Sequence, residues 1–151
     1  MLWQIFSMGL KQTETKNKIP ADSQYLWHGS RTTEPSIIYK GEEGFDVIYS
    51  SEGMWGKGLY FALDASYSHL YAHKHANGDR GMFLSLVNIG KVANVEYDED
   101  VTRRFRSPPN QMDSVRGEAE YKSDGKLTKS DIIVVYANKK AYPMYYVTYK
   151  E

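Results

Sequence analysis

Short apolar runs alternate with polar, glycine-containing stretches along the chain, and this pattern predicts a mixture of strands and short helices. Brief runs rich in tyrosine, valine, isoleucine and leucine that end at a glycine or a polar residue are typical of buried strands. We predict strands at residues 25–27, 59–62, 82–87, 132–136 and 144–149, with a further short strand near Val115. The polar residues 138–140 predict a hairpin-like reversal between the last two strands.

Helices are expected at three places. Pro35 favours the first turn of a short helix that ends near Gly41, and Asp64 is a good N-cap for a helix from about residue 65 to 76. Residues 1–10 fit a short amphipathic helix, a strand or a frayed terminus, whereas residues 11–23 are polar and turn-like. Residues 98–126 are rich in charge, so we expect an exposed excursion there. The sequence therefore predicts an α+β domain.

Length and composition narrow the class of protein. The 151 residues fit one domain, 1–151, in which residues 1–24 lead into a core at 25–150. The 19 basic and 19 acidic residues balance, which removes a general attraction to nucleic acid or acidic membranes. The absence of cysteine excludes disulfides and cysteine-ligated zinc. No apolar run approaches the length of a membrane span. The 13 tyrosines fit either a binding cleft or a tyrosine-lined sheet.

Three segments carry the candidate chemistry. The first is Leu-Trp-His-Gly-Ser at 26–30, at the end of a predicted strand. The second is Gly-Lys-Gly-Leu-Tyr-Phe-Ala at 56–62, followed by Ala-Ser-Tyr-Ser-His-Leu-Tyr at 65–71, and the third is Ala-Tyr-Pro-Met-Tyr at 141–145. Each segment alone is a weak signal, because a lone histidine after apolar residues is usually a core histidine. The glycine patterns of classical dinucleotide folds and P-loops are absent.

Together, and in this order, the three segments resemble the catalytic domain of the poly(ADP-ribose) polymerase family. The resemblance runs from about residue 26 to residue 149. The residues that match the family's motifs are His28, Gly29, 56–62, Ser66, Ser68, Tyr71 and 141–145. The resemblance implies the compact ADP-ribosyltransferase fold, which consists mostly of short antiparallel strands with a few short helices.

The resemblance also implies NAD as co-substrate, no metal, and cleavage of the bond between nicotinamide and ribose through an oxocarbenium-like sugar. The Gly29 backbone and the Ser68 hydroxyl would bind the carboxamide, and Tyr60 and Tyr71 would sandwich the ring. His28 and Ser30 would hydrogen-bond sugar hydroxyls. The implied NAD-binding set is His28, Gly29, Ser30, Tyr60, Phe61, Ala62, Ser68 and Tyr71, and the implied catalytic set is His28, Tyr60 and Ile132.

One departure from the family pattern bears on the reaction. Chain-building members carry a glutamate on the strand before the final Tyr-Pro motif, and counting back from Ala141 places Ile132 there. Asp131 is adjacent, but neighbouring strand residues face opposite sides of a sheet. The resemblance then implies transfer of one ADP-ribose unit to a protein acceptor, which includes the enzyme itself. A nucleic-acid acceptor has no support in the sequence. Two alternatives stay open: a binding module for NAD or ADP-ribose without turnover, and an NAD glycohydrolase.

Other candidate features have plainer interpretations. His69 and His73 have a spacing that can bind zinc on a helix, but no third ligand accompanies them, so we expect a solvated helix face. Residues 103–106 are basic with one aromatic, but acidic residues 98–100 precede them, so we expect an exposed loop. The loop at 46–55 is short and contains no arginine. We expect a monomer in the cytoplasm or nucleus, where NAD is supplied, with no membrane partner.

Overall fold

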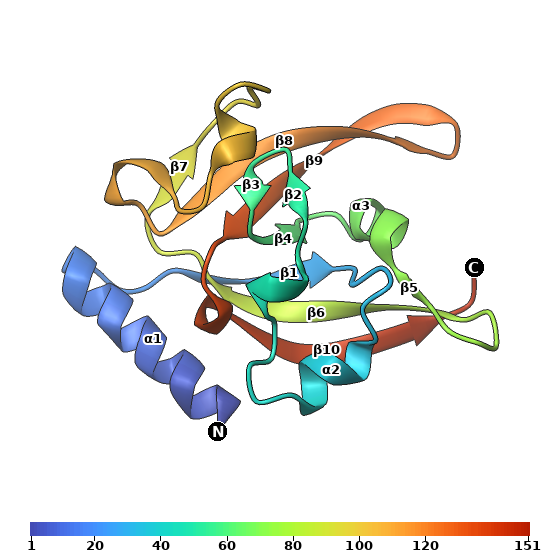
Figure 1. The fold of residues 1–151 in the computed structure, drawn as a ribbon, viewed down its shortest axis with the longest axis horizontal. Helices are drawn as coiled ribbons and strands as arrows, with labels where there is room; N and C mark the ends of the chain where they lie inside the picture. Colours follow the sequence, from blue (N-terminus) through green and yellow to red (C-terminus); the bar gives the residue numbers. More distant parts are fainter.

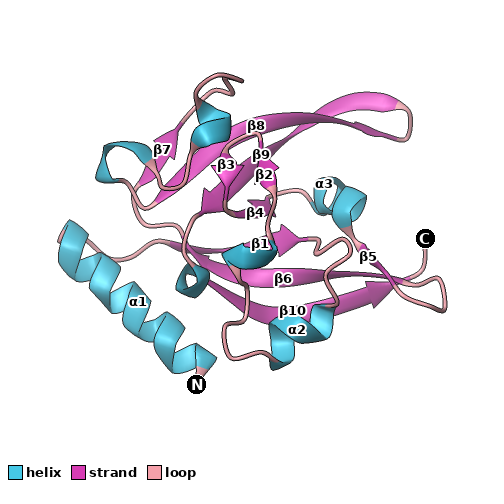
Figure 2. Cartoon of the chain, in the orientation of Figure 1, coloured by secondary structure: helices cyan, strands magenta, loops and turns pink.

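The computed structural model describes residues 1–151, which form an α+β fold built on one large sheet (Figures 1 and 2). Eight strands form this sheet in the order β10-β6-β1-β4-β9-β8-β7, with β5 also paired to β6, and β2 and β3 form a separate ribbon. Every pairing is antiparallel except that of β7 with β8. The α+β class expected from the sequence is therefore confirmed.

The bounds of the elements are as follows. The strands are β1 (Ser23–His28), β2 (Glu52–Gly53), β3 (Gly56–Lys57), β4 (Leu59–Ala62), β5 (His73–Lys74), β6 (Arg80–Asn88), β7 (Val92–Asn94), β8 (Ser114–Ser123), β9 (Lys126–Val135) and β10 (Ala141–Tyr149). The helices are α1 (Leu2–Asn17), α2 (Pro35–Lys40) and α3 (Ala65–Ser68). The short 3-10 turns are η1 (Val47–Tyr49), η2 (His69–Tyr71), η3 (Thr102–Arg104), η4 (Pro109–Gln111) and η5 (Asn138–Lys140).

The main core lies on the face of the sheet that the segment between α2 and β3 covers (Figure 1). Leu26, Phe61, Phe83 and Ile133 come from four neighbouring strands and pack together there. Phe45 descends onto this layer from the covering segment, with its ring 5.4 Å from the rings of both Phe61 and Phe83. Burial of such large rings is the main stabilising contribution in a domain of this size.

The N-terminal helix is longer than the sequence pattern predicts. Residues 11–17, expected to be turn-like, continue α1, which ends at Lys18 in the left-handed conformation with φ 58°. Phe6 is its buried anchor, and Trp3 meets Tyr142 of β10 edge-on with 5.2 Å between the rings. The later part of the helix contacts the domain through polar groups: the Asn88 side-chain amide donates a hydrogen bond to the Thr13 hydroxyl at 2.9 Å. Hydrophobic periodicity does not detect such a polar interface.

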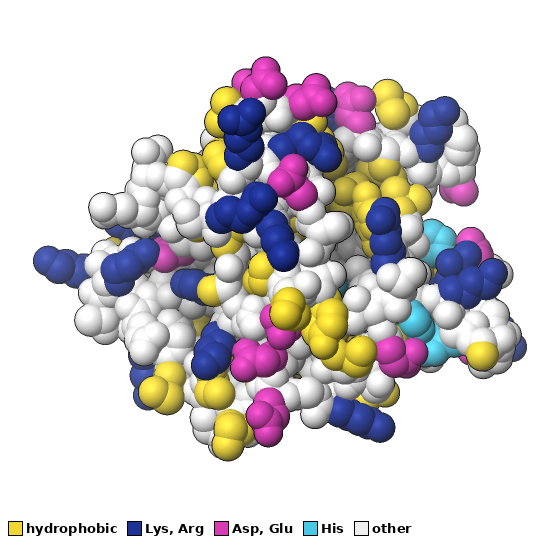
Figure 3. Space-filling model, in the orientation of Figure 1, with side chains coloured by type: hydrophobic (Ala, Val, Ile, Leu, Met, Phe, Trp, Pro, Cys, Tyr) yellow, Lys and Arg dark blue, Asp and Glu magenta, His cyan; other side chains and the backbone are white.

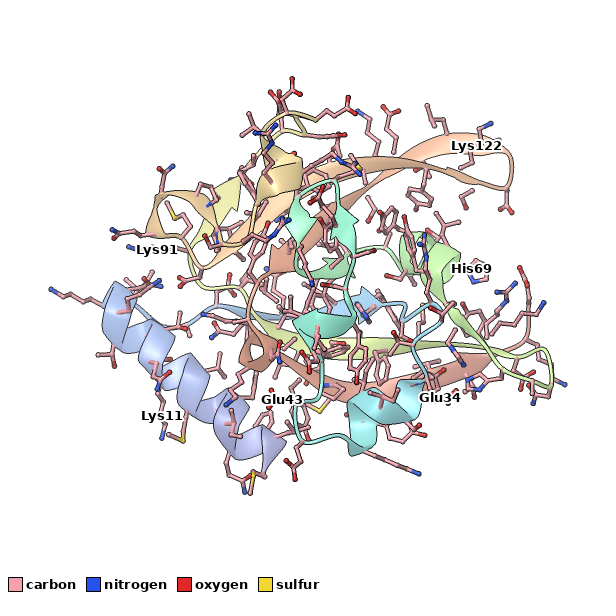
Figure 4. The ribbon with its side chains drawn as sticks, in the orientation of Figure 1. Lys11, Glu34, Glu43, His69, Lys91 and Lys122 are labelled. Atoms are coloured by element: carbon pink, nitrogen blue, oxygen red, sulfur yellow. The ribbon has the colours of Figure 1, made fainter.

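The helix predicted at residues 65–76 is wrong beyond its first turns. Helix α3 ends at Ser68, η2 adds a tighter turn, and the chain then becomes extended and enters β5. Tertiary contacts impose this end: the N–H of Arg31 donates to the Tyr71 carbonyl at 2.7 Å, and His73 pairs with Gly81 of β6. His73 therefore lies on a strand and not on a helix face, while His69 lies beside α3 (Figure 4).

The predicted exposed excursion at 98–126 holds a long strand. β8 and β9 each have ten residues and form a hairpin whose tip carries Lys122 away from the rest of the molecule (Figure 4). Asp124 and Gly125 at the turn have φ of 51° and 74°, as a type I′ turn requires. The Asp-Gly dipeptide is the local signal that could have revealed this hairpin. The structure has ten strands, where the sequence pattern predicts five or six.

The predicted hairpin at residues 138–140 is also wrong. β9 and β10 do not pair with each other, because β4, β1 and β6 lie between them in the sheet. Residues 138–140 form η5, which crosses one end of the sheet. The Asn138 side chain accepts a hydrogen bond from the Val47 N–H at 2.9 Å and donates to Asp46 at 3.0 Å. The crossing segment thus holds the loop that covers the core.

Candidate active site

A cavity of about 400 Å³ opens between the ends of β1 and β4, the α3–η2 turn and the loop of residues 45–58 that lies in front of them (Figure 1). Cavities of this size hold small-molecule ligands and cofactors in other proteins. All of the NAD-binding residues implied by the sequence line it: His28, Gly29, Ser30, Tyr60, Phe61, Ala62, Ser68 and Tyr71. Residues that are up to 43 positions apart in the sequence therefore meet in one place.

His28 is the last residue of β1, and its ring is held on three sides. The Nδ1–H donates to the Tyr60 carbonyl at 2.7 Å, and the rings of Phe45 and Phe61 lie 5.0 and 5.2 Å away. Burial lowers the pKa of His28, against the smaller opposing influence of the hydrogen bond to Tyr60. The imidazole is therefore neutral near pH 7, and its Nε2 remains an acceptor for a hydroxyl group.

Gly29 packs so closely against the α3–η2 turn that no side chain fits. A Cβ at this position would lie 2.5 Å from the Tyr71 carbonyl and 2.7 Å from the Ser68 carbonyl oxygen. Both contacts are with backbone, which cannot yield without moving the turn. The glycine thus brings the peptide groups after β1 next to the buried Ser68.

Tyr60 and Tyr71, which the resemblance places on either side of the nicotinamide ring, both line the cavity, and Tyr67 packs directly against Tyr71. The rings of Tyr67 and Tyr71 are 5.4 Å apart and their hydroxyl oxygens are 3.4 Å apart. The Tyr60 hydroxyl is engaged in the covering loop, where it donates to the Gly56 carbonyl at 2.7 Å and accepts from the Trp55 N–H at 2.8 Å. Tyr67 lies within the motif at 65–71, four residues before Tyr71, and this helical spacing could have identified the pair.

Three of the other implied residues mainly shape the cavity. The Ser30 hydroxyl donates to the Thr33 carbonyl at 2.9 Å, so it already has a partner inside the protein. Phe61 and Ala62 are both 1% exposed; Phe61 packs in the main core and Ala62 packs beside Ile132. Their side chains hold β4 in place beneath the cavity.

Ile132 lies below the cavity and does not line it. It is fully buried on β9 between Ala62 of β4 and Gly117 of β8. The Trp55 indole covers this position, with its Nε1–H donating to the Val95 carbonyl at 3.0 Å. Asp131 lies on the opposite face of the sheet, where it forms an ion pair with Arg116. No carboxylate therefore stands at the position of residue 132.

A second loop, residues 98–106, braces the covering loop from outside. The Phe105 carbonyl accepts from the Lys57 N–H at 3.0 Å, and Thr102 donates to the Met54 carbonyl at 2.6 Å. Gly56 has φ 84° and sits directly against the Phe105 backbone, which leaves no room for a side chain. Arg103 thus lines the cavity and Phe105 packs against the core beside it, whereas Arg104 and Arg106 are exposed as the sequence suggested.

The histidines beyond the cavity make hydrogen bonds within the protein. His73 Nδ1 lies 2.7 Å from the Arg31 carbonyl, and His69 Nδ1 lies 2.6 Å from the Tyr149 hydroxyl. The structure contains no cluster of three or more histidine, aspartate or glutamate side chains that could hold a metal ion. None of the helices combines the length and the apolar character needed to cross a membrane.

Comparison with known proteins supports the family resemblance that the sequence motifs indicated. The family model of the poly(ADP-ribose) polymerase catalytic domain matches residues 1–151. A Dictyostelium discoideum protein named as a probable poly(ADP-ribose) polymerase is 30% identical over 155 residues, which cover 99% of this chain and 41% of that protein. The human protein mono-ADP-ribosyltransferase PARP14 is 25% identical over 99% of this chain and 8% of its own length.

A third relative, the mouse protein mono-ADP-ribosyltransferase PARP12, is 27% identical over 98% of this chain and 20% of its own length. The chain thus spans less than half the length of these curated relatives. The family model nevertheless matches the whole chain, and the first two motif segments, at 26–30 and 56–71, both contribute residues to one cavity. The chain belongs to the poly(ADP-ribose) polymerase catalytic domain family.

Proposed function

We propose that this domain is an NAD-dependent ADP-ribosyltransferase that passes a single ADP-ribose unit to a protein acceptor. The observation that carries the proposal is the meeting of His28, Gly29, Ser68 and Tyr71 around one cavity, above an aliphatic residue at position 132. Relatives that are named mono-ADP-ribosyltransferases support the same reaction class.

The nicotinamide ring binds at the α3–η2 wall in this proposal. The peptide groups of Gly29 and the hydroxyl of Ser68 hydrogen-bond the carboxamide, and Tyr71 provides a face on which the cationic ring stacks. Tyr67 packs against Tyr71 and limits its movement. Held in this way, the ring cannot rotate while its bond to the ribose breaks.

His28 orients the ribose. Its Nδ1–H is committed to the Tyr60 carbonyl, so the neutral Nε2 accepts a hydrogen bond from a sugar hydroxyl. The bond between C1′ and the nicotinamide nitrogen breaks with its electron pair leaving on the ring, and positive charge develops on the sugar. His28 contributes orientation in this step and neither gives nor takes a proton.

The acceptor supplies its own nucleophile. A carboxylate side chain of the acceptor protein attacks C1′ without first losing a proton, which fits a site that has no carboxylate at position 132. Nicotinamide and a glycosyl ester are the products, and charge balances because the cationic ring leaves neutral. The enzyme itself is among the proteins that could present such a side chain.

Incubation with NAD labelled in the adenosine half tests the proposal. We expect nicotinamide release together with label on protein, and loss of both in Tyr71→Ala. Tyr145→Ala is the matched control, because Tyr145 is an exposed tyrosine on β10 outside the cavity. Nicotinamide release with free ADP-ribose and unlabelled protein would identify a glycohydrolase, and NAD binding without nicotinamide release would identify a binding module.

A further inference from the structure

Two arginines line the mouth of the cavity from different walls. Arg31 follows β1, and its guanidinium carbon lies 4.5 Å from the centre of the Tyr71 ring. Arg103 belongs to η3 in the bracing loop, where it donates to the Tyr97 hydroxyl at 3.4 Å. Basic side chains flank the hollow at the centre of this face, over the β2–β3 ribbon and beside α3 (Figure 3).

These two positive charges have no acidic partner. Neither Arg31 nor Arg103 forms an ion pair, although the mouth also contains two acidic residues. Glu52 is paired with Arg106 at 2.9 Å, outside the cavity. Asp46 accepts from the Ile48 N–H and from the Asn138 amide, each at 3.0 Å. These donors are neutral, so Asp46 keeps its negative charge, and Arg31 and Arg103 together with Asp46 leave one net positive charge at the mouth, which favours an anionic part of a ligand.

The position of Arg31 is fixed by its backbone. Its φ of 52° lies in the left-handed region, which residues other than glycine adopt infrequently. The conformation is held by two hydrogen bonds of 2.7 Å, from the Arg31 N–H to the Tyr71 carbonyl and from His73 Nδ1–H to the Arg31 carbonyl. Such a backbone, maintained by its surroundings, fixes the point beside the ring-binding wall from which the Arg31 side chain extends.

We propose that Arg31 and Arg103 hold the diphosphate of the bound dinucleotide between them at the mouth of the cavity. The inference rests on the proposed function, because it takes NAD as the ligand with its nicotinamide at the Tyr71 wall. The diphosphate is the only anionic part of NAD, and guanidinium groups bind phosphate oxygens through paired, charge-assisted hydrogen bonds. The loop of residues 46–55 contains no arginine, so these two residues supply the positive charge from elsewhere.

Binding of two ligands to a small set of variants tests the clamp. ADP-ribose carries the diphosphate without nicotinamide, and 3-aminobenzamide carries a nicotinamide-like ring without phosphate. We expect Arg103→Gln and Arg31→Gln each to weaken ADP-ribose about tenfold, because each removes charged hydrogen bonds. Arg103→Gln should leave 3-aminobenzamide within about twofold of wild type, since a neutral ring lacks the phosphate that the clamp binds. Arg104→Gln is the matched control, because this exposed neighbour does not line the cavity.

Calorimetric titration at low and high salt adds a readout that a structural role would not change. We expect the affinity of wild type for ADP-ribose to fall as salt rises, and this dependence to be smaller in the double variant that combines Arg31→Gln with Arg103→Gln. The clamp is overturned if the double variant keeps its ADP-ribose affinity, or if Arg104→Gln weakens ADP-ribose equally. Unchanged ADP-ribose binding with reduced labelling of acidic peptides would assign Arg103 to the acceptor and also overturn it. A wild type that binds neither ligand would overturn the proposed function as well.

Discussion

Replacing Ile132 with glutamate would put into this chain the carboxylate that chain-building members of its family carry. The structure gives the physical setting of that change: Ile132 is fully buried beneath Trp55, between Ala62 and Gly117. A carboxylate in such a dry site is disfavoured, so the new side chain should take up a proton instead of remaining charged. The substitution is therefore expected to cost stability in a manner that depends on pH.

The magnitude follows from the ordinary pKa of a glutamate, about 4.3, and from 1.36 kcal/mol per pKa unit. Keeping the side chain neutral at pH 7 costs about 3.7 kcal/mol, and at pH 5 only about 1 kcal/mol. Ile132→Gln is the matched control, because it introduces a polar side chain of similar shape that does not titrate. We expect the glutamine variant to be more stable than the glutamate variant by about 3.7 kcal/mol at pH 7.

Urea unfolding at pH 5, 6 and 7, followed by tryptophan fluorescence, measures this difference for both variants. A domain of this size typically has about 5–15 kcal/mol of stability, so the glutamate variant should remain folded at pH 5. The reasoning is refuted if the two variants have equal stability at pH 7, because the carboxylate would then reach water. We also expect wild type and the glutamate variant to give a discrete labelled band with NAD. A smear from wild type would show that Ile132 does not occupy the glutamate position.

Three further predictions concern other residues. Tyr71→Ala should reduce the rise in melting temperature that 3-aminobenzamide gives to wild type, corresponding to about 1 kcal/mol or more of lost stacking; an unchanged rise would remove Tyr71 from the ring site. Burial lowers the pKa of His28, so the unfolded state binds the extra proton below about pH 6.5 and stability should fall there; His28→Gln should flatten this dependence in urea unfolding, and an equal slope would contradict the assignment. Burial alone would raise the pKa of Asp113, but hydrogen bonds from Lys16 and Asn17 outweigh it and lower that pKa; the resulting stability is present above about pH 3.8 and lost below it. Asp113→Ala should cost about 3 kcal/mol in urea unfolding at pH 7, because this buried carboxylate accepts hydrogen bonds from Lys16, Asn17 and the Lys91 N–H, and a cost under about 1 kcal/mol would show that these bonds contribute little.

Local sequence determined the parts of this protein that depend on nearest neighbours in the chain. Helix α2 begins at Pro35 and is followed by Gly41, as proline at a first helical turn predicts. The short apolar runs at 59–62 and 82–87 are strands, as predicted. Their apolar residues follow one another without alternation because both faces of these strands are covered. The motif residues from His28 to Tyr71 could be assigned to one cavity through family resemblance, although nothing in their spacing alone brings them together.

Tertiary structure decided what the local pattern could not. A good N-cap at Asp64 favours a helix through residue 76, yet the hydrogen bond from Arg31 to Tyr71 and the pairing of β5 with β6 end it after Ser68. Strand β8 has only small residues, Gly117 and Ala119, in the middle of its buried side, so its alternating pattern is a weak signal, and its pairing with β9 sets its full length. The absence of an acidic partner for Arg31 and Arg103 depends on which distant groups lie within a few ångströms of them. The sequence determines such contacts only through the complete fold, because two residues far apart in the chain interact only after folding has brought them within contact distance.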